Sequence, residues 1–249
     1  MKTLTPVLLV AVAGVCGCSA PEPPSVEAEL SDAETLLAQS IAYHDPSDDW
    51  SEFSGTLGLE EIRPDGVSRD AEVGLDVATG GFSYSVEADG REVVKRMSQD
   101  GCTATIDGVA PDEADVATHR LECDQIERSR NYYLYLWGLP MKLRDPGTRI
   151  DPNVERTEFE GQAVNQIRVT YDADVGGDTW YFYFEPASAR MVGYRFYHDE
   201  RAGDGEYITL EGEVVVGEMR IPARRRWFVN ADDRFLGEDV LVRTGAFSP

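Results

Sequence analysis

The chain has 249 residues and a formal net charge of -23, with 46 acidic against 23 basic side chains. Such an acidic surface repels phosphate groups, so the composition argues against nucleic-acid binding and against electrostatic attraction to an anionic membrane. Only Lys2, Lys95 and Lys142 are lysines. Together with the acidic excess, this indicates a salt-adapted, halophilic protein.

Residues 1–17 are predicted to be a bacterial lipoprotein signal peptide. Lys2 supplies a basic start, residues 4–15 are almost entirely apolar, and Gly17 is the small residue that a signal peptidase needs. Cys18 would carry the lipid, and residues 18–30 would form a flexible tether. The alternatives are a lipid on Cys16, which follows the bulky Val15, and a transmembrane helix. The apolar run is shorter than the roughly 20 residues that a spanning helix needs.

Residues 31–249 are predicted to form a single domain, because no linker, fixed-period repeat or low-complexity tract interrupts them. Cys102 and Cys123 are predicted to form a disulfide, since the signal peptide directs them to an oxidising compartment. A metal pair is the alternative, but the sequence near them offers no further thiol and no His-x-x-His motif.

Two helices are predicted. The first begins at Ser31, which forms a capping box with Glu34, and ends at Pro46. The second would be capped by Asp124 and Glu127 and would stop near Gly138 after about thirteen residues. Its residues 131–137 are apolar or aromatic nearly all round, so we expect burial on several faces.

The remaining patterns are those of strands. Alternating apolar residues predict strands at 53–59, 73–77, 82–87, 92–97, 102–106, 164–171, 179–184, 190–197, 207–216 and 220–229. Pro222 indicates an edge or a bulge. Both faces of residues 180–184 are aromatic, so one face could pack on the second helix while the other needs cover or a ligand. This order predicts an α+β, mainly β fold with a large curved antiparallel sheet wrapped around one or two helices.

Three segments carry a family resemblance: Ile41–Pro46 with Trp50 and Phe53 after it, Asn131–Leu143, and Asp178–Phe184. Over nearly all of the mature chain, the sequence resembles an uncharacterised family of Gram-negative bacterial lipoproteins, a domain of unknown function with no activity to carry over. More distantly, its layout is similar to the LolA and LolB-like lipoprotein carrier and receptor fold. That resemblance implies a half-open barrel with internal helices that holds acyl chains, and it bears on fold more than on function.

The sequence gives little support for catalysis, a cofactor or a metal. No Gly-x-Ser-x-Gly motif occurs. His198 and Glu200 could share a metal, but such sites need three or four converging ligands. His44, before Asp45 at the end of the first helix, is either a cation facing the helix dipole or a general base. The three arginines 224–226 either pair with Glu206, Glu211 and Glu213 on a neighbouring strand or bind a lipid phosphate or an acidic partner.

We therefore predict a non-enzymatic lipoprotein of the cell envelope that binds a hydrophobic or lipidated ligand, such as an acyl chain or a lipoprotein. Candidate ligand-lining residues, which are otherwise ordinary core, are Tyr133, Trp137, Trp180, Phe182 and Phe184. The alternatives are an envelope interaction protein with a filled core and a hydrolase using His44 or His198. The lipid on Cys18 would anchor the protein facing the periplasm, and Ser19 favours the outer membrane.

The acidic composition predicts a salt-dependent stability. At about 1 M NaCl the Debye length falls to about 3 Å, so repulsion between surface carboxylates is screened. We expect the melting temperature, followed by circular dichroism, to rise steadily as NaCl is added. A melting temperature that does not change with NaCl would contradict the halophilic interpretation.

Overall fold

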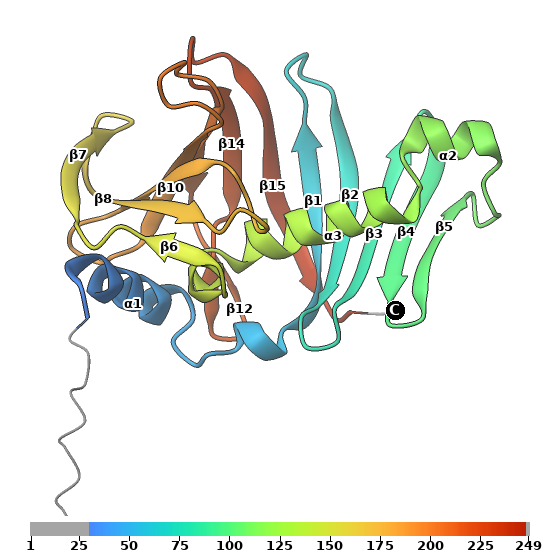
Figure 1. The fold of residues 1–249 in the computed structure, drawn as a ribbon. Helices are drawn as coiled ribbons and strands as arrows, with labels where there is room; N and C mark the ends of the chain where they lie inside the picture. The colour runs from blue at the N-terminus through green and yellow to red at the C-terminus, as the bar shows by residue number, and fades with distance from the viewer. Residues whose placement is uncertain (1–29, 248–249) are drawn as a thin grey trace, which may run out of the picture.

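The computed structural model describes residues 30–247, shown as a ribbon in Figure 1. The predicted signal peptide, Cys18 and most of the tether lie outside the described residues. Within the described part, no helix is both long and apolar enough to cross a membrane. As predicted, the fold is mainly β, with a large antiparallel sheet that is not closed into a barrel and one long helix across it.

Helix α1 (Asp32–His44) begins where the sequence predicts. The Ser31 hydroxyl accepts a hydrogen bond from the Glu34 N–H at 3.2 Å, and the Ser31 N–H donates to the Glu34 carboxylate at 2.8 Å. The capping box is therefore complete. The buried face of α1 contains Ala33, Leu36, Leu37, Ser40, Ile41 and His44. A short 3-10 helix, η1 (Trp50–Glu52), leads into the sheet.

His44, at the end of α1, is only 2% exposed, and both of its ring nitrogens are hydrogen-bonded. Nδ1 donates to the Arg220 carbonyl at 2.7 Å, and Nε2 accepts from the Met191 N–H at 3.0 Å. The ring is therefore neutral, and burial lowers the pKa of His44 below its usual value. The expectation of a cationic His44 is wrong, because two backbone groups from the second half of the chain fix the neutral tautomer.

The first half of the sheet is a meander in which each strand is antiparallel to the next. Its strands are β1 (Ser54–Ile62), β2 (Ser68–Asp76), β3 (Gly81–Ala88), β4 (Arg91–Ser98) and β5 (Gly101–Ile106). The alternating apolar residues of β1 and β2 point to the concave face, where Leu57, Leu59, Val73 and Leu75 are at most 1% exposed. This face forms most of the core.

Helices α2 (Glu113–His119) and α3 (Cys123–Gly138) follow β5. The sequence did not predict α2. The disulfide between Cys102 and Cys123 is confirmed, and it ties β5 to the first residue of α3. The predicted cap at Asp124 is wrong: the N-cap is Glu122, because the disulfide holds Cys123 against β5 and the helix begins there. Glu127 pairs with Arg130 at 3.2 Å instead of completing a capping box.

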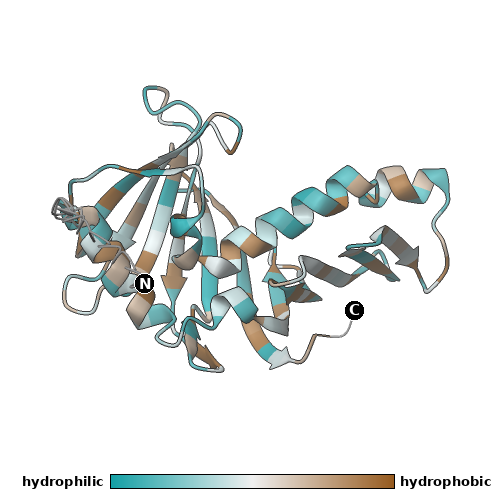
Figure 2. Cartoon of the chain, turned by 60° about the horizontal axis from the view of Figure 1, so that its bottom comes forward, coloured by the Kyte–Doolittle hydropathy of each residue, from teal (hydrophilic) through white to brown (hydrophobic). Residues whose placement is uncertain are grey.

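Burial of α3 differs from the prediction, since the open sheet covers only one side of the helix. Leu136 and Trp137 are 4% and 1% exposed, whereas Tyr132 is 48% exposed. Figure 2 shows hydrophilic and hydrophobic residues mixed along this helix, which lies on one side of the strands. After α3, the 3-10 helix η2 (Met141–Arg144) leads into the second half of the sheet.

The second half contains β6 (Thr148–Ile150), β7 (Glu155–Phe159), β8 (Gln162–Tyr171), β9 (Thr179–Phe184), β10 (Met191–Tyr197), β11 (Glu206–Glu211) and β14 (Arg224–Val229). The two last predicted strands are each divided. Gly212, with a φ of 61°, ends β11, and Pro222 separates β13 from β14. The pieces between them pair as a separate hairpin of β12 (Val214–Val216) and β13 (Met219–Ile221).

Strand β15 (Phe235–Gly245), which the sequence did not predict, joins the two halves. It pairs with β1 on one side and β14 on the other. The order of the 13-stranded sheet is therefore β5-β4-β3-β2-β1-β15-β14-β11-β10-β9-β8-β6, with β7 paired to β8. The sheet curves around α3, as Figure 1 shows, and its two ends remain apart.

The outer face of the aromatic strand β9 is covered by the chain itself. The Tyr183 ring stacks on Phe159 of β7 with 4.2 Å between centroids, and Tyr207 and Phe228 extend this cluster. The second aromatic face thus packs against a neighbouring strand.

Replacing His44 by alanine should destabilise the protein by roughly 3 kcal/mol, because a buried carbonyl and a buried N–H would both lose their partners. Urea unfolding of the variant and the parent measures this difference in the free energy of unfolding. The matched control is His198→Ala, whose side chain is 64% exposed and should cost little.

The same histidine gives stability a pH dependence. Since the folded-state pKa of His44 lies below the ordinary value of 6.5, the unfolded chain takes up the proton first as the pH falls. The His44 contribution is therefore complete above the ordinary pKa and is lost below it. A His44→Ala variant that is as stable as the parent would contradict this assignment.

Candidate functional site

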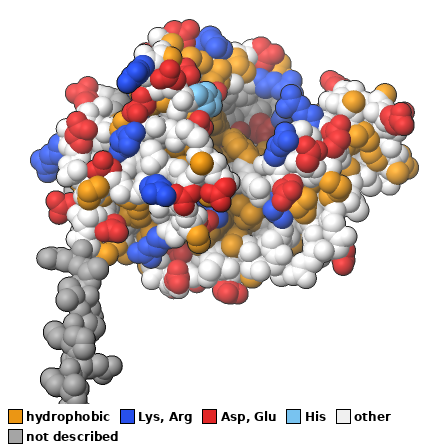
Figure 3. Space-filling view, viewed as in Figure 1, with side chains coloured by type: hydrophobic (Ala, Val, Ile, Leu, Met, Phe, Trp, Pro, Cys, Tyr) orange, Lys and Arg blue, Asp and Glu red, His pale blue; other side chains and the backbone are white. Residues whose placement is uncertain are grey.

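A cavity lies between α3 and the concave face of the sheet. Its volume is about 620 Å³, and its walls come from α3 and from β1, β2, β9, β10, β11, β14 and β15. Ile62, Glu206 and Leu236 lie at its wall where β1 ends and where β11 and β15 begin, so it opens at that edge of the sheet. Figure 3 shows a hollow in this region with hydrophobic side chains in it and a group of Lys and Arg along one side. We call it the aromatic cavity.

Aromatic side chains form much of its wall, and most of them are only half-buried although they point inward. Trp180 packs against Tyr135 with 5.5 Å between ring centroids and against Phe196 with 4.8 Å. The aromatic residues that line the cavity are Tyr132, Tyr133, Tyr135, Trp180, Tyr194, Phe196 and Trp227. Six charged residues also line it: Glu61, Arg63, Arg69, Glu206, Glu238 and Asp239. Cavities of this size that combine apolar rings with polar groups are typical of ligand-binding sites.

The predicted ligand-lining residues divide into two groups. Tyr133 and Trp180 line the aromatic cavity. Trp137, Phe182 and Phe184 are 1%, 0% and 0% exposed and belong to the packed core beside it. Contact of any of the five with a ligand stays a prediction, and so does the lipid on Cys18, which lies outside the described residues.

A row of four charged residues crosses the concave face next to the cavity. In the register of the sheet, Glu61 of β1 lies opposite both Arg69 of β2 and Asp239 of β15, and Asp239 lies opposite Arg225 of β14. Opposite residues on adjacent strands face the same side of a sheet. The row therefore places two carboxylates between two guanidinium groups inside the fold.

Arg225 is 2% exposed and holds the end of α3 to the sheet. Its guanidinium carbon lies 3.7 Å from the centre of the Trp137 ring, and one of its N–H groups donates to the Leu136 carbonyl at 3.3 Å. Leu136 is in the last turn of α3, where carbonyls lack helical partners and a cation is favoured. Burial lowers the pKa of Arg225.

The two carboxylates of the row differ in their surroundings. Glu61 accepts hydrogen bonds from Arg69 Nε at 2.6 Å, from the Tyr84 hydroxyl at 3.1 Å and from the Tyr133 hydroxyl at 3.3 Å. Asp239 lies at the cavity wall, where burial and the Glu61 charge raise its pKa to about 7. The carboxyl of Asp239 can therefore gain or lose a proton near neutral pH.

Sequence reasoning missed this row. The sequence offers one indication of this row. Side chains alternate between the two faces of β14, so Arg225 lies on the same face as the aromatic Trp227. The sequence pattern instead groups Arg225 with Arg224 and Arg226 as one basic run. Those two point the other way and pair with Glu238, while Arg226 also pairs with Glu211 at 2.9 Å. The predicted cross-strand pairing is thus right for Glu211 and wrong for Arg225, which faces inward.

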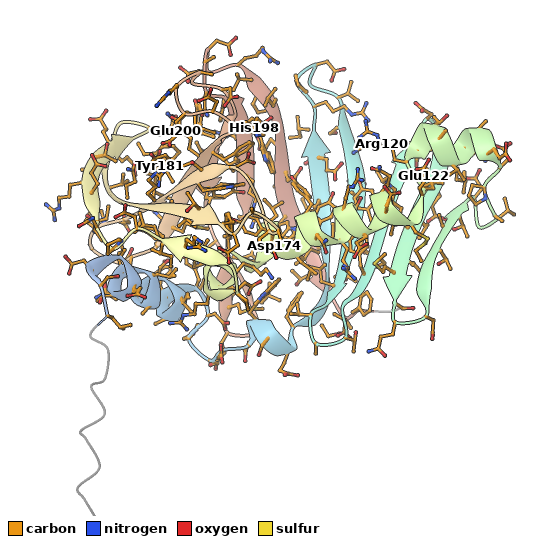
Figure 4. All side chains as sticks on the ribbon, in the orientation of Figure 1. Arg120, Glu122, Asp174, Tyr181, His198 and Glu200 are labelled. Carbon is orange, nitrogen blue, oxygen red and sulfur yellow. A yellow bond between two sulfur atoms is a disulfide. The ribbon has the colours of Figure 1, made fainter. Side chains whose placement is uncertain are left out.

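The histidines do not assemble a catalytic group with the residues considered from sequence. Both His44 nitrogens are bonded to backbone, which leaves no lone pair to act as a base. His198 Nδ1 contacts Asp178 at 2.7 Å on the surface, which raises the pKa of His198. Glu200 instead contacts Arg168 and Tyr181, and Figure 4 shows it beside Tyr181.

Comparison with known proteins supplies a family and a fold. A family described as "Family of unknown function (DUF6503)" matches residues 23–244. No curated protein matches the chain.

Among solved structures, the chain is similar to a LolA superfamily protein from Nitrosomonas europaea, with 10% identity, a TM-score of 0.53 and coverage of 89% of this chain and 96% of that one. It is also similar to a DUF1329 family protein from Desulfovibrio piger, with 6% identity, a TM-score of 0.45 and coverage of 87% and 93%. The first likeness shows a LolA-like fold. It confirms the fold predicted from the sequence.

Replacing Arg225 by leucine should destabilise the protein by about 3 kcal/mol, because Asp239 would keep a buried charge without its cation. The loss should be larger at about pH 8, where Asp239 is ionised, than at about pH 5, where it is protonated. Adding Asp239→Asn should restore part of the stability at the higher pH.

Urea unfolding of the single and double variants measures these differences. Arg224→Leu is the matched control, since it removes a neighbouring arginine on the outer face and leaves Glu238 paired with Arg226. If Arg224→Leu and Arg225→Leu lower the free energy of unfolding equally, the burial of Arg225 does not increase its contribution to stability.

Proposed function

Since this chain belongs to DUF6503, a family of unknown function, and has a LolA-like fold, we propose that it is a lipid-anchored lipoprotein of the cell envelope that binds an acyl chain. The chain would be held in the aromatic cavity by shape and apolar burial, without a chemical reaction. Cys18 would carry the anchor, and the domain would face the periplasm, with the outer membrane favoured by Ser19.

The observation that carries this proposal is the aromatic cavity itself. Its volume of about 620 Å³ lies within the roughly 300–1,000 Å³ of small-molecule sites, and it is open to solvent, so a ligand can enter it. Burying apolar surface contributes about 25 cal/mol per Å², and the half-buried rings of Tyr135, Trp180 and Trp227 offer such surface.

The cavity wall combines aromatic rings with polar groups, as the wall of a site for an amphiphile does. The Tyr194 hydroxyl is not one of the groups offered to a ligand, because it is buried beside Arg225. The resemblance to the lipoprotein carrier fold implies the same class of ligand, an acyl chain or an acylated protein.

The aromatic cavity favours ligand binding over the alternative of an envelope interaction protein with a filled core. Such a protein would bind its partner with the outer face, and half-buried rings around a cavity would serve no purpose in that binding. Hydrolysis at His44 is disfavoured because both ring nitrogens are bonded to the backbone.

We expect the protein purified from the periplasm as Cys18→Ser to carry a stoichiometric acyl compound. Extraction with organic solvent followed by mass spectrometry identifies it, since Cys18→Ser removes the covalent lipid. The delipidated protein should then bind a fluorescent polyene fatty acid. The bound fatty acid should quench the tryptophan fluorescence of the protein, because Trp180 and Trp227 line the cavity.

A pair of variants on β15 localises the binding. Leu236→Trp places a large ring at the mouth of the cavity and should weaken binding of the fatty acid at least several-fold. Val242→Trp, at a residue that is 51% exposed, is the control and should leave binding unchanged. A stable protein that yields no lipid and binds no fatty acid would favour the interaction protein instead.

A further inference from the structure

A second hollow lies on the other side of Tyr132 and Tyr133. Its volume is about 610 Å³, and it is an open hollow lined by β2, β3 and β4, by the end of α2 and by α3 from Gln125 to Tyr133. It shares Arg69, Tyr132 and Tyr133 with the aromatic cavity, so the two hollows meet at these side chains.

The charge of this second hollow is opposite to that of the protein. Arg69, Lys95, Arg120 and Arg128 line it together with His119, and among its described lining residues none is acidic. In a chain with twice as many acidic as basic side chains, an all-basic lining is unexpected. We call it the basic hollow.

Acidic neighbours compensate only part of this charge. Arg69 pairs with Glu61 at 2.6 Å, and Arg128 forms an exposed pair with Asp124 at 3.1 Å. Within residues 30–247, neither Lys95 nor Arg120 forms an ion pair. Glu122, which Figure 4 labels beside Arg120 near the link between α2 and α3, adds a negative charge in the vicinity of Lys95.

Lys95 occupies the floor of the basic hollow. It lies opposite Tyr84 on the concave face, with its ammonium 6.0 Å from the centre of that ring. Burial first, and then the charges of Arg120 and Arg69, lower the pKa of Lys95. A half-buried ammonium that faces other cations gains most from an anion placed between them.

We propose that the basic hollow binds the anionic headgroup, a phosphate or a carboxylate, of an amphiphile whose acyl chain occupies the aromatic cavity. This inference rests on the proposed function and names the ligand class for it. The ligand would bend around Tyr132 and Tyr133, with its apolar part among the rings and its charge among Lys95, Arg120 and Arg128.

A matched pair of ligands tests the charge requirement. Lysophosphatidic acid and a monoacylglycerol with the same acyl chain differ only in the phosphate, and glycerol phosphate supplies the headgroup alone. Binding of each to the Cys18→Ser protein, with its own lipid removed, is measured by calorimetry at one fixed NaCl concentration. We expect lysophosphatidic acid to bind about tenfold more tightly than the monoacylglycerol, the value for one charged hydrogen bond.

Two adjacent residues of β4 give the control. Lys95→Gln removes a charge from the basic hollow, whereas Arg96→Gln removes the same charge from an exposed side chain on the opposite face. We expect Lys95→Gln to remove most of the preference for lysophosphatidic acid without weakening the monoacylglycerol, and Arg96→Gln to change neither.

The other outcomes are distinct. Equal binding of both lipids, unchanged by Lys95→Gln, would overturn the headgroup site and leave acyl binding intact. Tight binding of glycerol phosphate, with no gain from the acyl chain, would overturn the amphiphile and indicate a site for a free phosphate compound. Binding of none of the three would overturn the proposed function and this inference together.

Discussion

The attachment of α3 across the open sheet is the constraint on which the rest of the structure depends. A helix of 16 residues is about 24 Å long. Strands lie about 4.8 Å apart, so a flat sheet of 13 strands would be more than twice as wide as the helix. One helix therefore covers about five strands, and the sheet must curl around it. The two hollows lie between α3 and the sheet, one after the other along the helix, where no further described segment fills the curve.

Three attachments of different kinds keep α3 in this position. The disulfide ties its first residue to β5, the Tyr133 hydroxyl donates to Glu61 of β1 at 3.3 Å, and Arg225 of β14 binds its last turn. Each attachment reaches a different part of the sheet, so the helix cannot settle onto one group of strands.

The parts of this fold that could be predicted are those encoded by neighbouring residues. The capping box at Ser31 and the strand Thr179–Phe184 are local patterns, and both occur as the sequence indicates. Strand β15 was missed because its inward positions include Asp239 and its outward positions alternate irregularly through a register shift. From the sequence alone, an acidic residue in a strand indicates a solvent-facing position, and only the pairing with neighbouring strands places it on the core face.

The same reason explains why the candidate site was only partly predicted. Tyr133 and Trp180 were found because aromatic residues indicate an apolar interior from composition alone. The charged row and the basic hollow depend on register and on the crossing of α3, which bring Arg69, Lys95 and Arg120 together from separate elements. In the sequence these residues are isolated charges among many acidic neighbours.

An acidic surface need not prevent an anion from binding in the basic hollow. The surface charges act on the anion from a long distance, whereas the cations of the hollow act on it at short range. At low salt the net charge of -23 would repel an anion well before it reached the protein. At about 1 M salt that repulsion is screened beyond about 3 Å, whereas charges inside a partly enclosed hollow are screened much less. The salt that the composition predicts to stabilise the carboxylate surface would thereby also let an anion approach Lys95 and Arg120. Under the halophilic interpretation, the protein would select an anionic ligand with a few partly buried cations while the rest of its surface stays acidic.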